Sequence, residues 1–238
     1  MQERTVRAPG NSMVDVVDVL RHHPFFTGLA PDSLSAVTRR TVIRVYEKGS
    51  LVYLEGEPAP GLYVVASGQI RIFKMSPDGR EQELFHASVG ESINEASALD
   101  GQPTIANAQA TETSVMLLIG RDALASLVRE FPQIGLEMSR VLAGRLRDMA
   151  RLAGDLSLRG VVPRMAGLLL RLAGPGAVVT LPTRNELAAM VGTVREVATR
   201  SLRQLESSGA IRLEARSAVI LDRAQLERHS GRRLPRVS

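Results

Sequence analysis

The 238-residue chain contains no cysteine and no tryptophan, and it has only three tyrosines and five phenylalanines. The absence of cysteine excludes disulfides, thiolate zinc sites and iron–sulfur clusters held by cysteine. No apolar run approaches the roughly 18 residues that a membrane-spanning helix needs. The opening stretch, MQERTVRAPGNS, is polar and lacks the apolar core of a signal peptide. We therefore expect a cytoplasmic protein that contacts no membrane.

Lysine is also missing from residues 159–238, whereas arginine is abundant there. This segment holds 14 arginines against six acidic residues, so its net charge is +8, and residues 1–158 carry −3. Such asymmetry indicates that the C-terminal third contacts a polyanion. On charge alone a solvated basic surface is the better explanation, so the choice between the two depends on the helix pattern in this segment.

Residues 41–120 carry a series of short strand patterns. Segments such as VIRVY, LYVVA, QIRIFKM and SVMLLI are rich in β-branched and aromatic residues and are separated by turn signals. Strand-and-turn units of this length predict a small antiparallel barrel or sandwich. Four of the turn glycines follow one another at intervals of eleven residues: Gly68, Gly79, Gly90 and Gly101.

Residues 121–158 return to helical periodicity, and their last part repeats apolar residues at spacings of four, three, four and three. This heptad-like seam is typical of a helix that packs along a partner. The alternative is that the seam packs on the chain's own barrel. We favour homodimerisation because the helix is long and lies between two domains. The seam residues are Leu142, Leu146, Met149, Ala153 and Leu156.

The segment TRNELAAMVGTVREVATRSL predicts a helix-turn-helix. Two capping-box patterns, a threonine followed three residues later by a glutamate, start at Thr183 and Thr193. They predict two helix starts ten residues apart, with Gly192 supplying the tight turn between the helices.

The second of these helices separates its residues by polarity. At 100° per residue, one arc holds Val194, Val197, Ala198, Ser201, Leu202 and Leu205. The opposite arc holds Arg195, Glu196, Thr199, Arg200 and Arg203. Arginine can bind guanine and glutamate can accept from cytosine in the major groove. A solvated face, with Glu196 only capping the helix, is the alternative. The turn, the basic segment and the following strand pair favour DNA reading.

Four motifs, LYVVASGQIRIFK, PDGREQEL, GESINEASALDGQPTIA and TRNELAAMVGTVREVATRSLRQLESSGAI, resemble the Crp/Fnr family. This is the family of the cyclic AMP receptor protein and the fumarate and nitrate reductase regulator, and the resemblance covers almost the whole chain. It implies an α+β fold with an N-terminal β-roll (a jelly roll like that of cyclic-nucleotide-binding domains), a long dimerisation helix and a C-terminal winged helix-turn-helix. We expect a disordered tail at 1–12, a sensor domain at 13–131, the dimerisation helix at 132–158 and the DNA-binding domain at 159–238.

The resemblance implies a transcription regulator that binds double-stranded DNA as a homodimer, with RNA polymerase as a further partner. Arg195, Glu196 and Arg200 match the family's Arg-Glu-x-x-x-Arg pattern and would read a palindrome of TGTGA-like half-sites, with Thr199 on the same base-reading face. Arg203 matches a phosphate-contacting lysine, and Thr183 and Arg184 begin the helix that crosses the DNA backbone. The expected phosphate contacts are Thr183, Arg184, Thr193 and Arg203.

The sensor matches the family's cyclic AMP pattern less well. Glu95 takes the position of a ribose-binding glutamate but follows Asn94 instead of glycine. Thr104 and Ile105 replace the arginine and serine that bind the phosphate in the family. A cyclic phosphate needs a cation or several donors, so we expect that cyclic AMP is not the effector. Met149 and Ala150 replace the adenine-binding threonine and serine. The candidate pocket consists of Asn94, Glu95, Ala96, Thr104, Ile105, Leu146, Met149 and Ala150.

The effector itself stays open at this point. The alternatives are a constitutively active protein, a neutral or apolar ligand, a cyclic nucleotide, and a haem held by His22, His23 or His86. A different class, a β-roll metalloenzyme, would need clustered histidines and carboxylates. Residues 41–120 contain only His86, so we predict no enzyme and no metal site.

Overall fold

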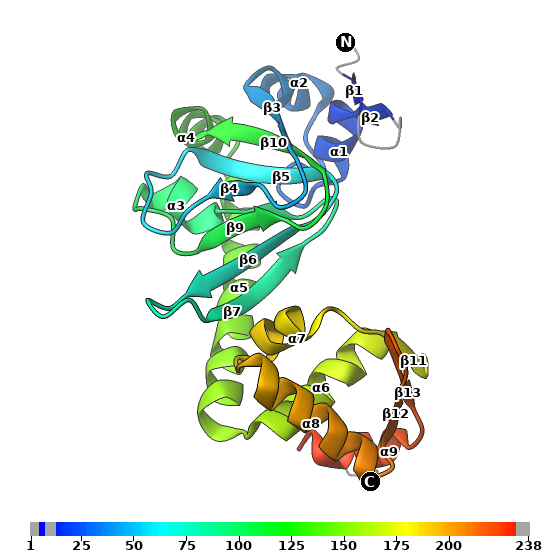
Figure 1. The fold of residues 1–238 in the computed structure, drawn as a ribbon. Coiled ribbons are helices and arrows are strands. Elements are labelled where there is room, and N and C mark those ends of the chain that lie inside the picture. Colours follow the sequence, from blue (N-terminus) through cyan, green and yellow to red (C-terminus); the bar gives the residue numbers. More distant parts are fainter. Residues whose placement is uncertain (1–4, 8–12, 232–238) are drawn as a thin grey trace, which may run out of the picture. The chain divides into compact units, whose positions relative to one another are not determined.

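The computed structural model describes residues 5–7 and 13–231 (Figure 1). The chain divides into two compact units, Met1–Lys74 with Leu84–Asp148, and Met75–Glu83 with Met149–Ser238. The division falls inside helix α5 (Pro132–Leu158), so the last part of this helix groups with the C-terminal unit. The boundary predicted from the sequence lay after the helix, at residue 159.

The N-terminal segment contains a short strand pair. Strand β1 (Thr5–Arg7) pairs antiparallel with β2 (Met13–Asp15), so part of the predicted tail is ordered as a strand. The rest of that tail lies outside the described residues. The helices α1 (Val16–His22) and α2 (Pro31–Arg39) follow.

Two four-stranded sheets form the main part of the first unit (Figure 1). Residues Met75–Glu83, which span a turn and the adjoining ends of two strands, group with the second unit. One sheet has the order β3–β10–β5–β8 and the other the order β4–β9–β6–β7. This arrangement confirms the predicted β-roll. The strands are β3 (Thr41–Tyr46), β4 (Leu51–Tyr53), β5 (Gly61–Ser67), β6 (Ile70–Met75), β7 (Glu81–Ala87), β8 (Ser92–Ile93), β9 (Asn107–Ala110) and β10 (Ser114–Gly120).

Strand β5 is buried on both faces, which explains its nearly continuous apolar sequence. Leu62 and Val64 belong to a core shared with α1, α2, α4 (Arg121–Glu130) and the start of α5. Tyr63 and Val65 point the other way and belong to the core between the two sheets. The four glycines spaced eleven residues apart all have positive φ: Gly68, Gly79 and Gly90 lie in turns between strands, and Gly101 ends the helix α3 (Glu95–Asp100).

The second unit is a winged helix-turn-helix (Figure 1). Its three-stranded sheet has the order β11–β13–β12, with antiparallel pairs. One core joins the apolar face of α6 to α7, α8 and the sheet. The elements are α6 (Val161–Ala173), β11 (Val178–Thr180), α7 (Arg184–Val191), α8 (Arg195–Ser207), β12 (Ile211–Leu213), β13 (Ser217–Ile220) and α9 (Arg223–His229).

Candidate nucleic-acid interface and sensor site

A capping box starts α7, as the sequence predicted. The Thr183 backbone N–H donates to Glu186 Oε2 at 2.7 Å, and the Glu186 N–H donates to Thr183 Oγ1 at 3.3 Å. The helix ends at Gly192, which has the left-handed conformation with φ of 68°. The Thr193 N–H then closes the turn on the Ala188 carbonyl at 2.9 Å. Local hydrogen bonds therefore fix both ends of the first helix.

The second predicted capping box, at Thr193, is wrong. Helix α8 starts at Arg195 with Val194 as its N-cap, and no side chain caps it. The reason is the turn: the Thr193 N–H is bonded to Ala188, which places Thr193 one residue before the cap. Val194 is 40% exposed, so it does not belong to the buried arc predicted for it. Glu196 consequently does not act as a capping residue.

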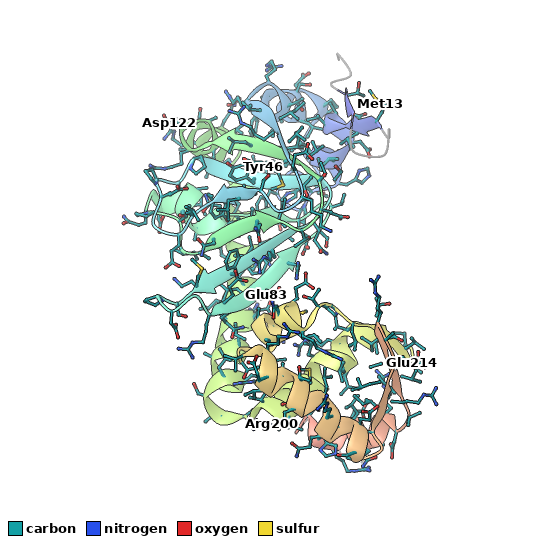
Figure 2. All side chains as sticks on the ribbon, in the orientation of Figure 1. Met13, Tyr46, Glu83, Asp122, Arg200 and Glu214 are labelled. Carbon is teal, nitrogen blue, oxygen red and sulfur yellow. The ribbon has the colours of Figure 1, made fainter. Side chains whose placement is uncertain are left out.

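The two faces of α8 otherwise separate as predicted. Ala198, Ser201, Leu202 and Leu205 are buried, and Val197 is partly buried. On the opposite face Arg195, Glu196, Arg200 and Arg203 are exposed (Figure 2 labels Arg200). Three guanidinium groups and one carboxylate thus project from one side of a helix whose other side is fixed in a core. This is the arrangement that major-groove reading requires.

Thr199 is partly buried between these exposed side chains. Its hydroxyl donates to the Arg195 carbonyl at 2.9 Å. The hydroxyl proton is therefore used within the helix, and the γ-methyl group is what the side chain retains for an apolar contact. Threonine methyl groups contact the 5-methyl of thymine in the major groove.

The expected phosphate-binding residues differ in accessibility. Thr183 and Arg203 are exposed, whereas Arg184 and Thr193 are partly buried. The Nη1 atom of Arg184 is buried and has no hydrogen-bond partner among the described residues. The sequence predicted no role for the wing, where the Arg212 Nη2 atom lies 3.5 Å from Glu214 Oε1. Figure 2 labels Glu214.

In the first unit, the polar groups of the candidate effector residues form hydrogen bonds with other residues of the roll. The Glu95 side chain is only 4% exposed and accepts from Ser92 Oγ at 2.7 Å. Burial raises the pKa of Glu95, while the hydrogen bond from Ser92 opposes that rise. Asn94 adopts the left-handed conformation with φ of 66°, and its Nδ2 donates to the Gly61 carbonyl at 2.9 Å. Asparagine tolerates this backbone, which explains why it can replace glycine here.

Thr104 is buried, and its hydroxyl donates to the Leu54 carbonyl. Its backbone N–H donates to the Glu57 carbonyl at 2.9 Å. Both polar groups of Thr104 therefore hold the turn after β4. Ile105 and Leu146 are 64% and 71% exposed in the single chain. Met149 and Ala150 belong to the second unit, and Ala96 is partly buried beside Glu95 in α3 (Glu95–Asp100).

The sequence reasoning missed Arg145. Its guanidinium carbon lies 3.7 Å from the centre of the Phe85 ring, and its Nη2 donates to the Ser92 carbonyl at 3.3 Å. This cation-π contact and hydrogen bond tie α5 to the roll beside Glu95. Arg145 sits beside the apolar seam like any surface arginine of an amphipathic helix, so no sequence signal distinguished it.

A cavity of about 210 Å³ lies next to Arg145, and His23 lines it. Cofactor and ligand pockets measure about 300–1,000 Å³, so this cavity is too small for a haem. His23 is 1% exposed, and burial lowers its pKa to about 4. Its Nδ1 accepts the Phe25 N–H at 3.2 Å, which leaves the proton on Nε2. A neutral histidine in this tautomer does not fit an iron ligand.

His22 and His86 are the other histidines that the sequence offered as haem ligands, and both lie among the described residues. His22 is exposed, and its Nδ1 lies 2.9 Å from the Asp18 carbonyl. His86 lies in β7. Over the described ranges 5–7 and 13–231, no three histidine or carboxylate side chains gather as metal ligands would. Within those ranges, no helix is both long and apolar enough to cross a membrane.

Comparison with known proteins agrees with this architecture. Residues 43–131 match the family model of the cyclic nucleotide-binding domain, and residues 163–229 match that of the Crp-like helix-turn-helix domain. The chain is 32% identical to the CRP-like cAMP-activated global transcriptional regulator of Mycobacterium tuberculosis, over 90% of this chain and 99% of that protein. It is also 32% identical to the cyclic AMP receptor protein of Thermus thermophilus, over 87% and 97% of the two chains.

Solved structures show the same fold. The catabolite activator protein of Thermus thermophilus superposes with a TM-score of 0.52 at 32% identity, over 87% of this chain and 98% of that one. The c-di-GMP-responsive global regulator CLP of Xanthomonas campestris superposes with a TM-score of 0.71 at 25% identity, over 80% and 99%. Two matched domains in this order, together with relatives aligned along nearly their whole length, show that the chain belongs to the Crp/Fnr family of DNA-binding transcription regulators.

Proposed function

We propose that this chain is a cytoplasmic, homodimeric transcription regulator that reads a palindrome of TGTGA-like half-sites. Arg195 and Arg200 bind guanines, and Glu196 accepts from a cytosine amino group. The single observation that carries the proposal is the exposed face of α8, where these three side chains project opposite the buried residues Ala198, Ser201, Leu202 and Leu205. The family's regulators act on DNA, and we propose no enzymatic activity for this chain. RNA polymerase is the further partner that we propose.

Dimerisation would use the seam of α5. Leu146 is 71% exposed, and Ala153 and Leu156 are also exposed in the single chain. Exposed apolar residues along one helix would be covered by the same helix of a second copy, as in a coiled coil. Two copies related by a twofold axis would present two α8 helices to two half-sites of a palindrome.

The effector of this regulator is not cyclic AMP, in our proposal, although relatives carry that nucleotide in their names. The Thr104 hydroxyl is bonded to the Leu54 carbonyl, and Glu95 is a buried carboxyl group held by Ser92. Neither group supplies the cation that a buried cyclic phosphate needs. The effector is another small molecule, or the dimer binds DNA without one. A haem-dependent version is disfavoured by the tautomer of His23 and by the size of the cavity beside it.

The DNA-reading roles can be tested by comparing Arg195→Ala with Arg203→Ala. Arg195→Ala should lose about 1–3 kcal/mol on the specific palindrome and relax the preference at one base pair. Arg203→Ala should weaken binding to all sequences alike and reduce the salt dependence, because a phosphate contact releases counterions. Equal losses on palindromic and random DNA for both variants would contradict the assignment.

A further inference from the structure

One arginine joins the carbonyl ends of two helices within the second unit. Arg164 lies in the first turn of α6, and its Nη1 donates to the Leu156 carbonyl at 3.2 Å. Its Nη2 donates to the Gly192 carbonyl at 3.3 Å. Leu156 is in the last turn of α5, and Gly192 is the turn between α7 and α8. A single guanidinium group therefore links the end of α5 to the turn of the helix-turn-helix.

The chemistry of helix ends explains why an arginine suits this position. The last carbonyls of a helix have no partner in the helix and carry its partial negative charge. Arg164 donates to one such carbonyl of α5 and to the residue that ends α7. Its planar guanidinium holds the two donors at a fixed separation, whereas a lysine ammonium acts as a point charge on a flexible stem. Arg164 therefore fixes the distance between two helix ends, which a lysine cannot do in the same way.

Packing brings the same two segments together. A Cβ atom added at Gly192 would lie 2.5 Å from Leu156 Cδ2, so the turn rests directly on the last turn of α5. A second arginine, Arg159, links the end of α5 to the end of α9. Arg159 pairs with Asp155 of α5 at 3.2 Å and donates to the carbonyl of Ser230, at the end of α9, at 3.0 Å. This agrees with the grouping of residues from Met149 onward with the second unit.

We propose that Arg164 is a positioning residue that sets the separation of the two recognition helices, and hence the half-site spacing that the dimer accepts. The inference rests on the proposed function, because it requires a dimer that reads a palindrome. In that dimer the seam residues Met149, Ala153 and Leu156 lie at the twofold axis. Any rotation of α8 about the end of α5 is then repeated in the second copy.

DNA geometry makes this link measurable. Half-sites read by such dimers lie about 34 Å apart, and one added base pair shifts a half-site by about 3.4 Å and turns it by about 35°. A rigid link between α5 and the turn makes the dimer sensitive to that change. Without the guanidinium fork, α8 can follow the displaced half-site, so binding to the altered spacing improves relative to the preferred one.

The experiment measures binding to palindromes that carry the preferred spacing and spacings one base pair longer and shorter. The variants are Arg164→Met and Arg164→Lys, and the latter keeps the charge but loses the fork. Arg223→Met is the matched control. Arg223 also donates to two backbone carbonyls, those of Gly174 and Gly176, but it ties α9 to the loop after α6 and does not contact α5.

For the wild type we expect binding about tenfold or more weaker at the wrong spacings, comparable to a mismatched base pair. Losing a charge-assisted hydrogen bond corresponds to roughly a tenfold change in an equilibrium constant. Both Arg164 variants should therefore reduce the ratio between preferred and wrong spacings by about tenfold. Arg223→Met should leave that ratio unchanged, and all proteins should keep the same preference for half-site sequence.

Two results would overturn the proposal. One is an unchanged spacing ratio in Arg164→Lys, which keeps the charge and can be measured even where Arg164→Met does not fold. The other is an equal loss of the ratio in Arg223→Met, which would reduce the effect to general destabilisation. A wild-type protein that binds palindromes no better than single half-sites contradicts the proposed dimeric function itself. An unchanged spacing ratio in the variants contradicts only the role of Arg164, so the two failures can be told apart.

Discussion

The first prediction distinguishes the contributions of the methyl group and the hydroxyl group of Thr199 to DNA binding. Its hydroxyl donates to the Arg195 carbonyl at 2.9 Å, so the side chain can offer its methyl group to DNA. The residue lies on the face of α8 that we propose reads bases, together with Arg195, and it directly precedes Arg200. In a TGTGA-like half-site the thymine between the two guanines is the base that we expect it to contact through the 5-methyl group.

The magnitude follows from burial of one methyl group on each half-site. Removing a methyl-sized apolar group from water contributes about 0.8 kcal/mol. A dimer that makes this contact twice gains about 1.6 kcal/mol, which is about fifteenfold in affinity. Replacing the two thymines by deoxyuridine, which lacks only the 5-methyl group, should therefore weaken wild-type binding by about that factor.

Two variants show which group of Thr199 causes the expected preference for thymine over deoxyuridine. Thr199→Ser keeps the hydroxyl bond to Arg195 and loses the methyl group, so it should bind thymine and deoxyuridine palindromes equally. Thr199→Val loses the hydroxyl and keeps a methyl group, so it should still prefer thymine. Fluorescence anisotropy with labelled palindromes measures all six affinities. The reasoning is refuted if Thr199→Ser discriminates as strongly as the wild type.

Three further predictions concern the dimer, the effector and pH. Leu146→Glu or Met149→Glu should impair dimerisation, because a charge buried without a partner is unfavourable; an intact dimer of both variants in light scattering would place the seam against the chain's own barrel. Isothermal titration with cyclic AMP and cyclic GMP should give no low-micromolar binding, and binding that also strengthens DNA binding would contradict this. His23 stays neutral in the folded protein because burial lowers its pKa from 6.5 to about 4. The unfolded chain therefore binds the extra proton first, and the free energy of unfolding should fall by roughly 3 kcal/mol as the pH drops through that range. His23→Gln should remove this slope in chemical denaturation, and a slope that persists would show that other groups cause it.

The helix-turn-helix could be predicted from sequence because local signals define it. The Thr183 capping box and the left-handed Gly192 involve residues close together in the chain. The burial pattern of α8 follows from its 3.6-residue period. The predicted N-cap of α8, Thr193, lies one residue before the observed N-cap, Val194, because a backbone bond from Thr193 to Ala188 overrides the capping pattern. Such a bond becomes visible only when the turn geometry is known.

Parts of the β-roll could not be predicted because their signals are not local. Strand β9 has the sequence NAQA, which lacks β-branched and aromatic residues, so nothing in it favours a strand. It is a strand because it pairs with β4 and β6, and its small residues Ala108 and Ala110 fill the core between the sheets. Arg145 was missed for the same reason, since its partners Phe85 and Ser92 lie far from it in the chain.

In the candidate effector pocket, the hydrogen-bond partners of a residue are better evidence of its role than the position it takes in the family's sequence pattern. By the family resemblance Thr104 would take the position of a phosphate-binding arginine, but its hydroxyl donates to the Leu54 carbonyl. Asn94 serves the Gly61 carbonyl, and Ser92 serves the Glu95 carboxyl group. A ligand that entered among these groups would have to replace bonds that contribute about 0.5–1.5 kcal/mol each. An apolar ligand offers no such replacement. An effector is therefore expected either to bring donors and acceptors of its own or to bind away from this loop, and in the latter case Thr104→Val would leave its affinity unchanged.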